Sequence, residues 1–205
     1  MSLRDALPDA SALEHASACE LVDATGNKVS FGSIIGSQKT VVVFVRHFFC
    51  GVGLIIQVEQ LAAVPQAALD AAGTKIVVIG CGEHQALSHY KEATSYNGLI
   101  YANPDRKLYH ALGMDKETYK VAPAGEQTPS YITRGYYANV WYSISNAILK
   151  APSLIGKQGN PGQLGGDFIF GPGNECTLAH RMQHAQDHIE VADLMKAAGV
   201  TLLDV

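Results

Sequence analysis

The chain has 205 residues, of which 47% are hydrophobic and 17% charged, so one compact domain can bury a sufficient core. The net charge of −4 and the isoelectric point near 6.0 provide no basic surface for phosphates, which argues against nucleic acid as a partner. Residues 1–20 contain no apolar core typical of a signal peptide, and no later run is long enough to span a membrane. We therefore expect a soluble cytoplasmic protein.

The N-terminal part of the chain predicts an arm, a hairpin and a buried strand. Residues 1–18 have some helical character and are expected to form a loosely packed arm. Residues 19–35 alternate around Thr25-Gly26-Asn27, a turn signal that favours a short hairpin. The run TVVVFVRHF at residues 40–48 is almost continuously β-branched or aromatic, as is typical of a central strand covered on both faces.

From Cys50 onward the pattern becomes helical. Apolar residues recur every three or four positions through Leu54, Val58 and Leu61, and this helix fades near Gly73. A second strand is expected at 75–81, a second helix at 83–96, a third strand at 98–103 and a short helix at 104–113. This alternation predicts an α/β fold.

Residues 115–166 differ from the rest of the chain. They are rich in glycine, proline, tyrosine and serine, with one helical pattern near residues 139–150. We interpret them as an insertion within a single domain of residues 19–205, because they hold too little periodic apolar sequence for their own core. Strands at 167–173 and 175–181 and a helix at 187–199 follow. The order predicts a thioredoxin-like fold, a central mixed sheet flanked by helices, with the insertion before the last two strands.

Cys50 is the main candidate for chemistry. It lies where the central strand passes into the first helix, at the sheet edge where α/β proteins place their sites. The amides of the first helical turn and the helix dipole favour a thiolate there, and Arg46 would stabilise it further. His47 is a candidate for proton transfer. The alternative is an inert, packed Cys50, with Arg46 paired to a carboxylate elsewhere.

The residues after Cys50 favour a pocket or ordinary core. Gly51 and Gly53 allow close approach of a ligand or of backbone, and Leu54 begins the apolar run Leu54-Ile55-Ile56. Cys50 also has no cysteine three residues later, and the other three cysteines are widely spaced. This spacing favours free thiols over a disulfide framework.

The chain resembles the peroxiredoxin-like branch of the alkyl hydroperoxide reductase and thiol-specific antioxidant family, which has a thioredoxin-like fold. The resemblance rests on VVVFVRHFFC, VVIGCGE, IYANPDRKLYHALGM, QLGGDFIFGPG and the residues His180-Arg181 and Asp187-His188. It implies an antioxidant thiol enzyme with a peroxide as its small-molecule substrate, an external thiol as reductant and no cofactor.

The chain departs from this family in two places. Gly53 stands where members of this branch commonly carry the second cysteine of a CxxC motif, and RHFF replaces the peroxide-binding loop that precedes the cysteine in typical peroxiredoxins. A one-cysteine peroxidase remains feasible, with Cys50 oxidised to a sulfenic acid that an external thiol reduces. Cys81 is the internal candidate for a resolving partner, and a structural cysteine is the alternative reading.

The loop before the later strand packs against the reactive cysteine in thioredoxin-like folds. Gly165, Gly166 and Asp167 are therefore expected to line the site. Asp167 is either a proton-transfer group or a solvated turn residue.

Two other groups of residues are candidates for a functional role. His180, His184 and His188 are spaced four apart, as metal ligands on one helix would be, but the first falls in a predicted strand, so we expect no metal. The aromatic residues of the insertion favour either a lid over Cys50 or a homodimer surface; they are Tyr131, Tyr136, Tyr137, Trp141 and Tyr142. The leading prediction is a one-cysteine peroxide reductase. The alternative is a redox-inactive scaffold that binds or converts a small hydrophobic metabolite in specialised metabolism.

Overall fold

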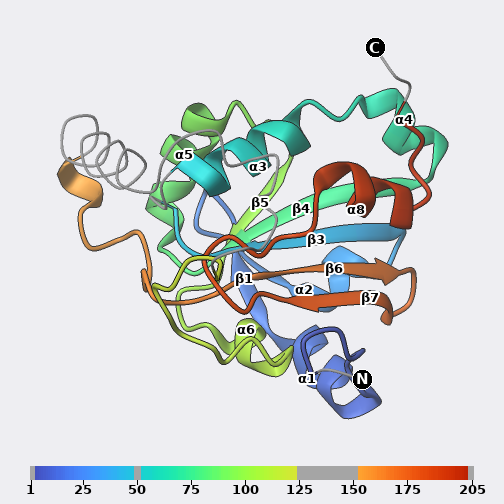
Figure 1. The fold of residues 1–205 in the computed structure, drawn as a ribbon, viewed down its shortest axis with the longest axis horizontal. Helices are drawn as coiled ribbons and strands as arrows, with labels where there is room; N and C mark the ends of the chain where they lie inside the picture. The colour runs from blue at the N-terminus through green and yellow to red at the C-terminus, as the bar shows by residue number, and fades with distance from the viewer. Residues whose placement is uncertain (1–2, 49–51, 124–151, 203–205) are drawn as a thin grey trace.

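A computed structural model describes residues 3–48, 52–123 and 152–202, and for residues 52–56 the backbone alone. Its centre is a sheet in the order β2-β1-β5-β4-β3-β6-β7 (Figure 1). The strands are β1 (Glu20–Val22), β2 (Lys28–Ser30), β3 (Lys39–Val45), β4 (Thr74–Gly80), β5 (Leu99–Ala102), β6 (Gly166–Gly171) and β7 (Glu175–Arg181). β3, β4 and β5 are parallel, and the remaining pairs are antiparallel. The predicted mixed sheet is thus confirmed.

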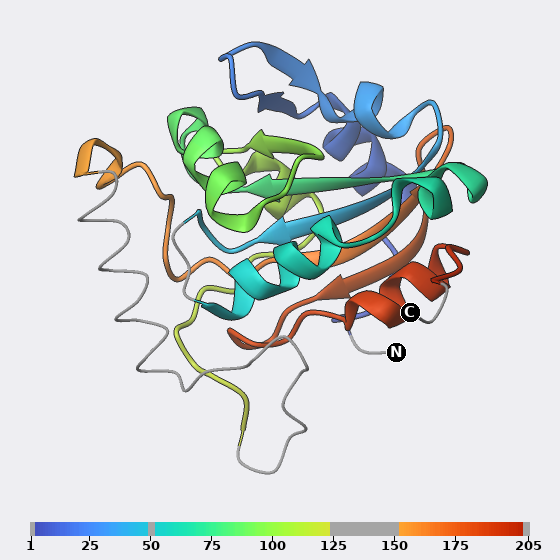
Figure 2. The same ribbon diagram turned by 90° about the horizontal axis from the view of Figure 1, so that it is seen from above.

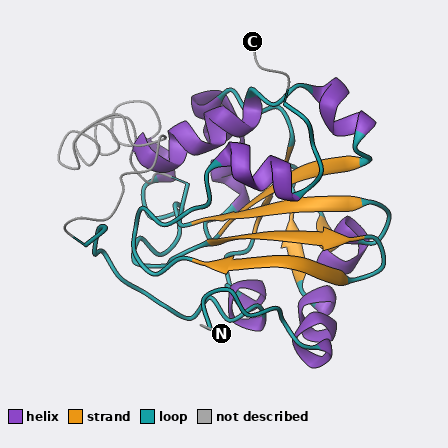
Figure 3. Cartoon of the chain, turned by 45° about the vertical axis from the view of Figure 1, so that its right-hand side comes forward, coloured by secondary structure: helices purple, strands orange, loops and turns teal. Residues whose placement is uncertain are grey.

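Helices cover both faces of the sheet (Figures 1 and 3). One face carries α3 (Val52–Ala62), α4 (Gln66–Ala71), α5 (Leu87–Thr94) and α8 (Val191–Ala197). The other carries α1 (Ala10–Ala18), α2 (Phe31–Ile35) and α6 (Lys107–Ala111). Seen from above, α3, α5 and α8 lie over the strands (Figure 2). Within the described residues, no helix is both long enough and apolar enough to cross a membrane.

The central strand β3 divides its side chains between these two layers. Val41, Val43 and Val45 enter the core beneath α3, α5 and α8. Val42 and Phe44 enter the core formed with α1, α2 and α6. Successive side chains of a strand point to opposite faces, so a strand covered on both faces is apolar at nearly every position.

Two of the predicted helices are interrupted. The helix expected from Cys50 to near Gly73 is divided into α3 and α4, with Pro65 at the N-terminal cap of α4. The helix stops here because proline has no amide hydrogen to donate and disfavours helical backbone in the residue before it. The apolar period of the sequence nevertheless continues through this break. The helix expected at 83–96 is a 3₁₀ turn, η1 (His84–Ala86), followed by α5. It ends at Ser95, which is left-handed with φ 53°.

The last two predicted helices are shorter than expected. α6 begins only after Arg106, whose φ is 57°. α8 begins at Val191 rather than at Asp187. The backbone amide of Ile189 donates to the carboxylate of Asp167 at 2.8 Å, which ties the preceding segment to the sheet instead of to a helix.

The two ends of the insertion lie against each other. The amide of Thr118 donates to the Gly162 carbonyl at 2.7 Å, and the amide of Leu164 donates to the Lys116 carbonyl at 3.1 Å. A 3₁₀ turn, η2 (Pro152–Leu154), precedes the returning end. The helical pattern near 139–150 and the aromatic cluster lie outside the described residues. The predicted domain boundaries stay predictions.

Candidate active site

The candidate site lies at the edge of the sheet where β3 and β4 end. Val45 and Gly80 are register partners in these parallel strands, so Arg46 and Cys81 follow them at the same edge. α3 begins at Val52, with Gly53 and Leu54 in its first turn. Cys50 and Gly51 lie outside the described residues. The residues on both sides of them define the surroundings of the segment that contains Cys50.

Arg46 connects this edge to the base of the insertion. Its guanidinium group is buried, and Nη2 donates to the backbone carbonyl of Pro161 at 2.7 Å and to that of Thr118 at 3.5 Å. These two carbonyls lie on the outgoing and returning ends of the insertion. Arg46 therefore supplies a positive charge four residues before Cys50 in the sequence and joins the end of β3 to the insertion.

His47 is buried, with 9% of its surface exposed. Burial and the neighbouring charge of Arg46 lower the pKa of His47 to about 3, because both disfavour the imidazolium form. The ring is therefore neutral at physiological pH. Its Nδ1 has no hydrogen-bond partner among the described residues. A neutral imidazole with an unpartnered ring nitrogen can form a hydrogen bond with a bound molecule.

Gln57 is a further buried polar residue close to this segment. It lies in α3, seven residues after Cys50, and is fully buried. Neither atom of its side-chain amide has a partner within the described part of the chain. An unmade buried hydrogen bond costs about 1–3 kcal/mol, so such groups call for a binding partner. Gln57 is not among the site residues predicted from the sequence. Its only signal was one polar residue within the apolar run LIIQV.

Cys81 is a buried thiol with 2% of its surface exposed. Its Sγ donates to the Arg46 carbonyl at 2.8 Å. The Gly159 backbone packs directly on it, since a Cβ added to Gly159 would lie 2.7 Å from Sγ. Cys81 is thus adjacent to the candidate site, as a resolving cysteine must be. The backbone at Gly159 would have to move before the sulfur of Cys81 could contact another thiol.

Tyr109 connects the two strand ends beneath the site. Its buried hydroxyl is placed to donate to the carbonyls of Val45 at 2.7 Å and Ile79 at 3.0 Å. Burial raises the pKa of Tyr109 well above its ordinary value, so the phenol stays protonated. Tyr109 is not among the site residues predicted from the sequence, because a tyrosine on a helix face is typical of the hydrophobic core.

Gly165 and Gly166 lie beside the end of β3. A Cβ at Gly165 would lie 1.7 Å from the Phe44 carbonyl oxygen, and one at Gly166 would lie 2.4 Å from the His180 carbonyl oxygen. No side chain fits at either position. The two glycines therefore allow this segment to pack closely against the strand that leads to Arg46.

Asp167 lies deeper, fully buried within the sheet. One carboxylate oxygen lies 2.9 Å from Nδ1 of His188, and the other accepts the Ile189 amide at 2.8 Å. The carboxylate thus anchors the segment before α8, and it is not the solvated turn residue that the sequence left open.

The other histidines of this region form a cluster with the N-terminal segment. The ring of His180 lies 3.0 Å from the Asp5 carboxylate and 2.6 Å from the Asp187 carbonyl. Arg4 binds the Asp187 carboxylate at 2.6 Å. Although burial acts to lower it, the hydrogen bond to Asp187 and the charges of Asp167 and Asp187 raise the pKa of His180. Among the described residues, no group of three or more His, Cys, Asp or Glu side chains is arranged to hold a metal ion.

Comparison with known proteins agrees with the resemblance seen in the sequence. The pattern of the AhpC/TSA antioxidant enzyme family matches residues 60–184. Peroxiredoxin-like 2C of Mus musculus is 34% identical over 183 residues, which cover 88% of this chain and 77% of that protein. Prostamide/prostaglandin F synthase of Xenopus tropicalis is 25% identical over 181 residues, which cover 86% of this chain and 82% of that protein.

A solved structure supports the fold. Reduced Prx3 from Vibrio vulnificus, in complex with H₂O₂, superposes with a TM-score of 0.60 at 14% identity and covers 94% of this chain and 98% of that one. At this identity the likeness shows the thioredoxin-like fold alone. Together with the sequence matches, it establishes that the chain belongs to the AhpC/TSA antioxidant enzyme family, as a peroxiredoxin-like redox protein.

Proposed function

We propose that this protein reduces a peroxide through Cys50 as its single peroxidatic thiol. The thiolate sulfur attacks one peroxide oxygen, an S–O bond forms and the O–O bond breaks. The other oxygen leaves with a proton as an alcohol or water, and Cys50 becomes a sulfenic acid. One external thiol then forms a mixed disulfide and releases water. A second external thiol restores Cys50 and leaves as the disulfide.

The observation that carries this proposal is the setting of the Cys50 segment. It joins the buried end of β3 to the start of α3, an eleven-residue helix whose N-terminal dipole favours a thiolate. The positive charge of Arg46 acts in the same direction. His47 is neutral and its buried Nδ1 has no partner among the described residues, which suits a hydrogen bond to a peroxide oxygen.

An external reductant follows from the positions of the other thiols. Gly53 supplies no second sulfur, and the thiol of Cys81 is bonded to the Arg46 carbonyl and covered by Gly159. We place Cys81 as a structural thiol under the resting site. Gly165 and Gly166 allow close packing beside the end of β3, and we propose that the substrate binds between this segment and the start of α3.

The decisive experiment compares the thiols of the full chain. Cys50 is expected to alkylate with a pKa below the free-thiol value of about 8.5 and to gain one oxygen on peroxide challenge, read by mass spectrometry. Cys176 provides the matched control, because burial raises its pKa to about 11. Cys50→Ser should abolish thiol-dependent peroxide consumption, whereas Cys176→Ser should retain it. Equal consumption by both variants would refute the proposal.

A second candidate function is conversion or binding of a small hydrophobic metabolite without cysteine redox chemistry. It is favoured by the relative named prostamide/prostaglandin F synthase and by the apolar residues that follow Cys50. In that case Cys50 stays unreactive in the folded chain, while the dye 1-anilinonaphthalene-8-sulfonate binds and Leu54→Glu weakens that binding. Dye binding that Leu54→Glu leaves unchanged argues against this candidate.

A further inference from the structure

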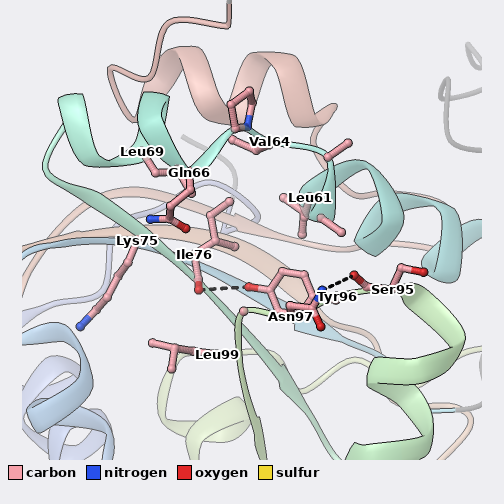
Figure 4. Close-up of a pocket in the computed structure, with 14 residues that line it drawn as sticks. Leu61, Val64, Gln66, Leu69, Lys75, Ile76, Ser95, Tyr96, Asn97 and Leu99 are labelled. Carbon is pink, nitrogen blue, oxygen red and sulfur yellow. Dashed lines mark hydrogen bonds between the residues drawn. The ribbon is translucent and has the colours of Figure 1, made fainter.

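A separate groove lies at the opposite end of the sheet from the candidate active site (Figure 4). Its volume is about 580 Å³, within the range of small-molecule sites. The end of α3, the turn into α4, the starts of β4 and β5 and the loop after α5 enclose it. Lys75, on its rim, lies near the start of β4, and Cys81 directly follows the end of this strand, a separation of about 20 Å. The groove is therefore not part of the redox site.

The groove combines apolar side chains with polar ones, the latter being Gln66, Lys75, Ser95 and Asn97. Leu61 and Val64 line it from the side of the α3–α4 connection, and Leu99 lies across from them (Figure 4). Leu99 is the first residue of β5, and 42% of the surface of this apolar residue is exposed to water. A ligand with an apolar body would cover this surface and stabilise the complex by about 25 cal/mol for each Å² buried.

Tyr96 gives the groove a fixed floor. Its ring is buried, and its hydroxyl donates to the Ile76 carbonyl at 3.1 Å (Figure 4). Gly98 packs directly against this ring, since a Cβ there would lie 2.5 Å from it. Ser95 reverses the chain just before Tyr96, with φ 53°. The floor is held by contacts with the backbone.

The charge of the groove has one sign. Lys75 is the one charged residue among those that line it, and no carboxylate lines it. Within the described chain, the Lys75 ammonium makes no ion pair, and Figure 4 shows it extending on the same side of the groove as Leu99. Burial lowers the pKa of Lys75, because no nearby anion compensates its partial desolvation. This local positive site contrasts with the net charge of −4 of the whole chain.

We propose that this groove binds a small amphiphilic monocarboxylate, with its carboxylate at Lys75 and its apolar body between Leu61, Val64 and Leu99. The carboxylate supplies the negative charge that the groove lacks. The hydrocarbon covers leucine surface that is otherwise in water. The assignment is independent of the reaction at Cys50.

The test is calorimetric titration of the full chain with decanoate, and with 1-decanol as the neutral counterpart. Lys75→Met should weaken decanoate binding about fivefold and leave decanol unaffected, as expected for one exposed ion pair. Leu99→Glu should weaken decanoate about tenfold or more, because it places a like charge at the site. Lys196→Met removes an exposed lysine on α8 that does not line the groove, and it should bind as the wild type does.

Three results would overturn the assignment. Absence of decanoate binding to the wild type would do so, as would decanol binding as tightly as decanoate. Decanoate binding that is unchanged in both Lys75→Met and Leu99→Glu would place the ligand elsewhere on the chain. Both substitutions are at residues with solvent exposure, and circular dichroism of each variant verifies that it is folded.

Discussion

Replacing Asp167 by alanine tests whether this carboxylate anchors the fold. Both of its oxygens are engaged inside the sheet, by the His188 ring at 2.9 Å and by the Ile189 amide at 2.8 Å. The side chains of Asp167 and His188 are both 0% exposed. Water cannot replace the lost carboxylate, so the substitution leaves two buried polar groups without their partner.

The expected loss follows from these two contacts. A buried polar group left without its partner costs about 1–3 kcal/mol, and Asp167→Ala leaves two such groups, the His188 ring and the Ile189 amide. We therefore expect Asp167→Ala to lower the free energy of unfolding by about 2–6 kcal/mol. For a chain of this length, the midpoint of thermal unfolding should fall by roughly 10 °C. Asp167→Asn keeps one acceptor oxygen and should lose less.

Urea unfolding followed by circular dichroism measures these differences. The control is Asp70→Ala, which removes an exposed carboxylate that accepts from Gln66 on the same helix and should cost less than about 0.5 kcal/mol. If Asp167→Ala is as stable as this control, the anchoring argument is wrong. If Asp167→Asn is as stable as the wild type but no longer reduces peroxide, Asp167 takes part in proton transfer instead.

Three further predictions concern titration and the strand ends. His47 has a lowered pKa of about 3, so its stability contribution is present above about pH 6.5 and is lost as the pH falls. Between pH 8 and pH 5 the chain should lose about 2 kcal/mol through this residue, and His47→Leu should remove that slope in urea titrations. His180 has a raised pKa, so its contribution to the free energy of unfolding is present below about pH 6.5 and is lost as the pH rises through its pKa in the folded state. His180→Gln should therefore lower the free energy of unfolding mainly at acidic pH. Tyr109→Phe should cost about 1–3 kcal/mol in the same assay, because the carbonyls of Val45 and Ile79 lose a shared buried donor, and an unchanged midpoint would contradict this.

The fold was predictable where neighbouring residues in the sequence determine the structure. Continuous β-branched and aromatic residues identified β3 as covered on both faces, and Thr25-Gly26-Asn27 identified the turn between β1 and β2. Pro65 is also a local signal for the end of a helix, but the apolar period continues through it and predicts one unbroken helix. Propensity and period therefore predicted which elements form more reliably than where they end.

The candidate site was only partly predictable, because its contacts join distant residues. An aspartate between a glycine pair and an apolar strand reads equally well as a turn residue or as a catalytic one. The partner that decides between these readings, His188, is 21 residues away. The only sequence signal of Gln57 is its place as one polar residue in an apolar run, and its burial without a partner is a property of the packed helix. Such contacts need the tertiary structure.

Substitutions of Arg46 can distinguish the effect of its charge from the effect of its hydrogen bonds. Its guanidinium donates to Pro161 and Thr118 carbonyls, so it joins the insertion to the sheet edge, and its charge also favours a thiolate nearby. Arg46→Gln should raise the pKa of Cys50 in the alkylation assay and cost about 1.5–3 kcal/mol of stability. Arg46→Lys keeps the charge but not the planar, two-carbonyl geometry, so it should retain the low thiol pKa while losing much of that stability. If Arg46→Lys instead loses the low thiol pKa together with the stability, Arg46 acts on Cys50 through the fold of the segment and not through its charge.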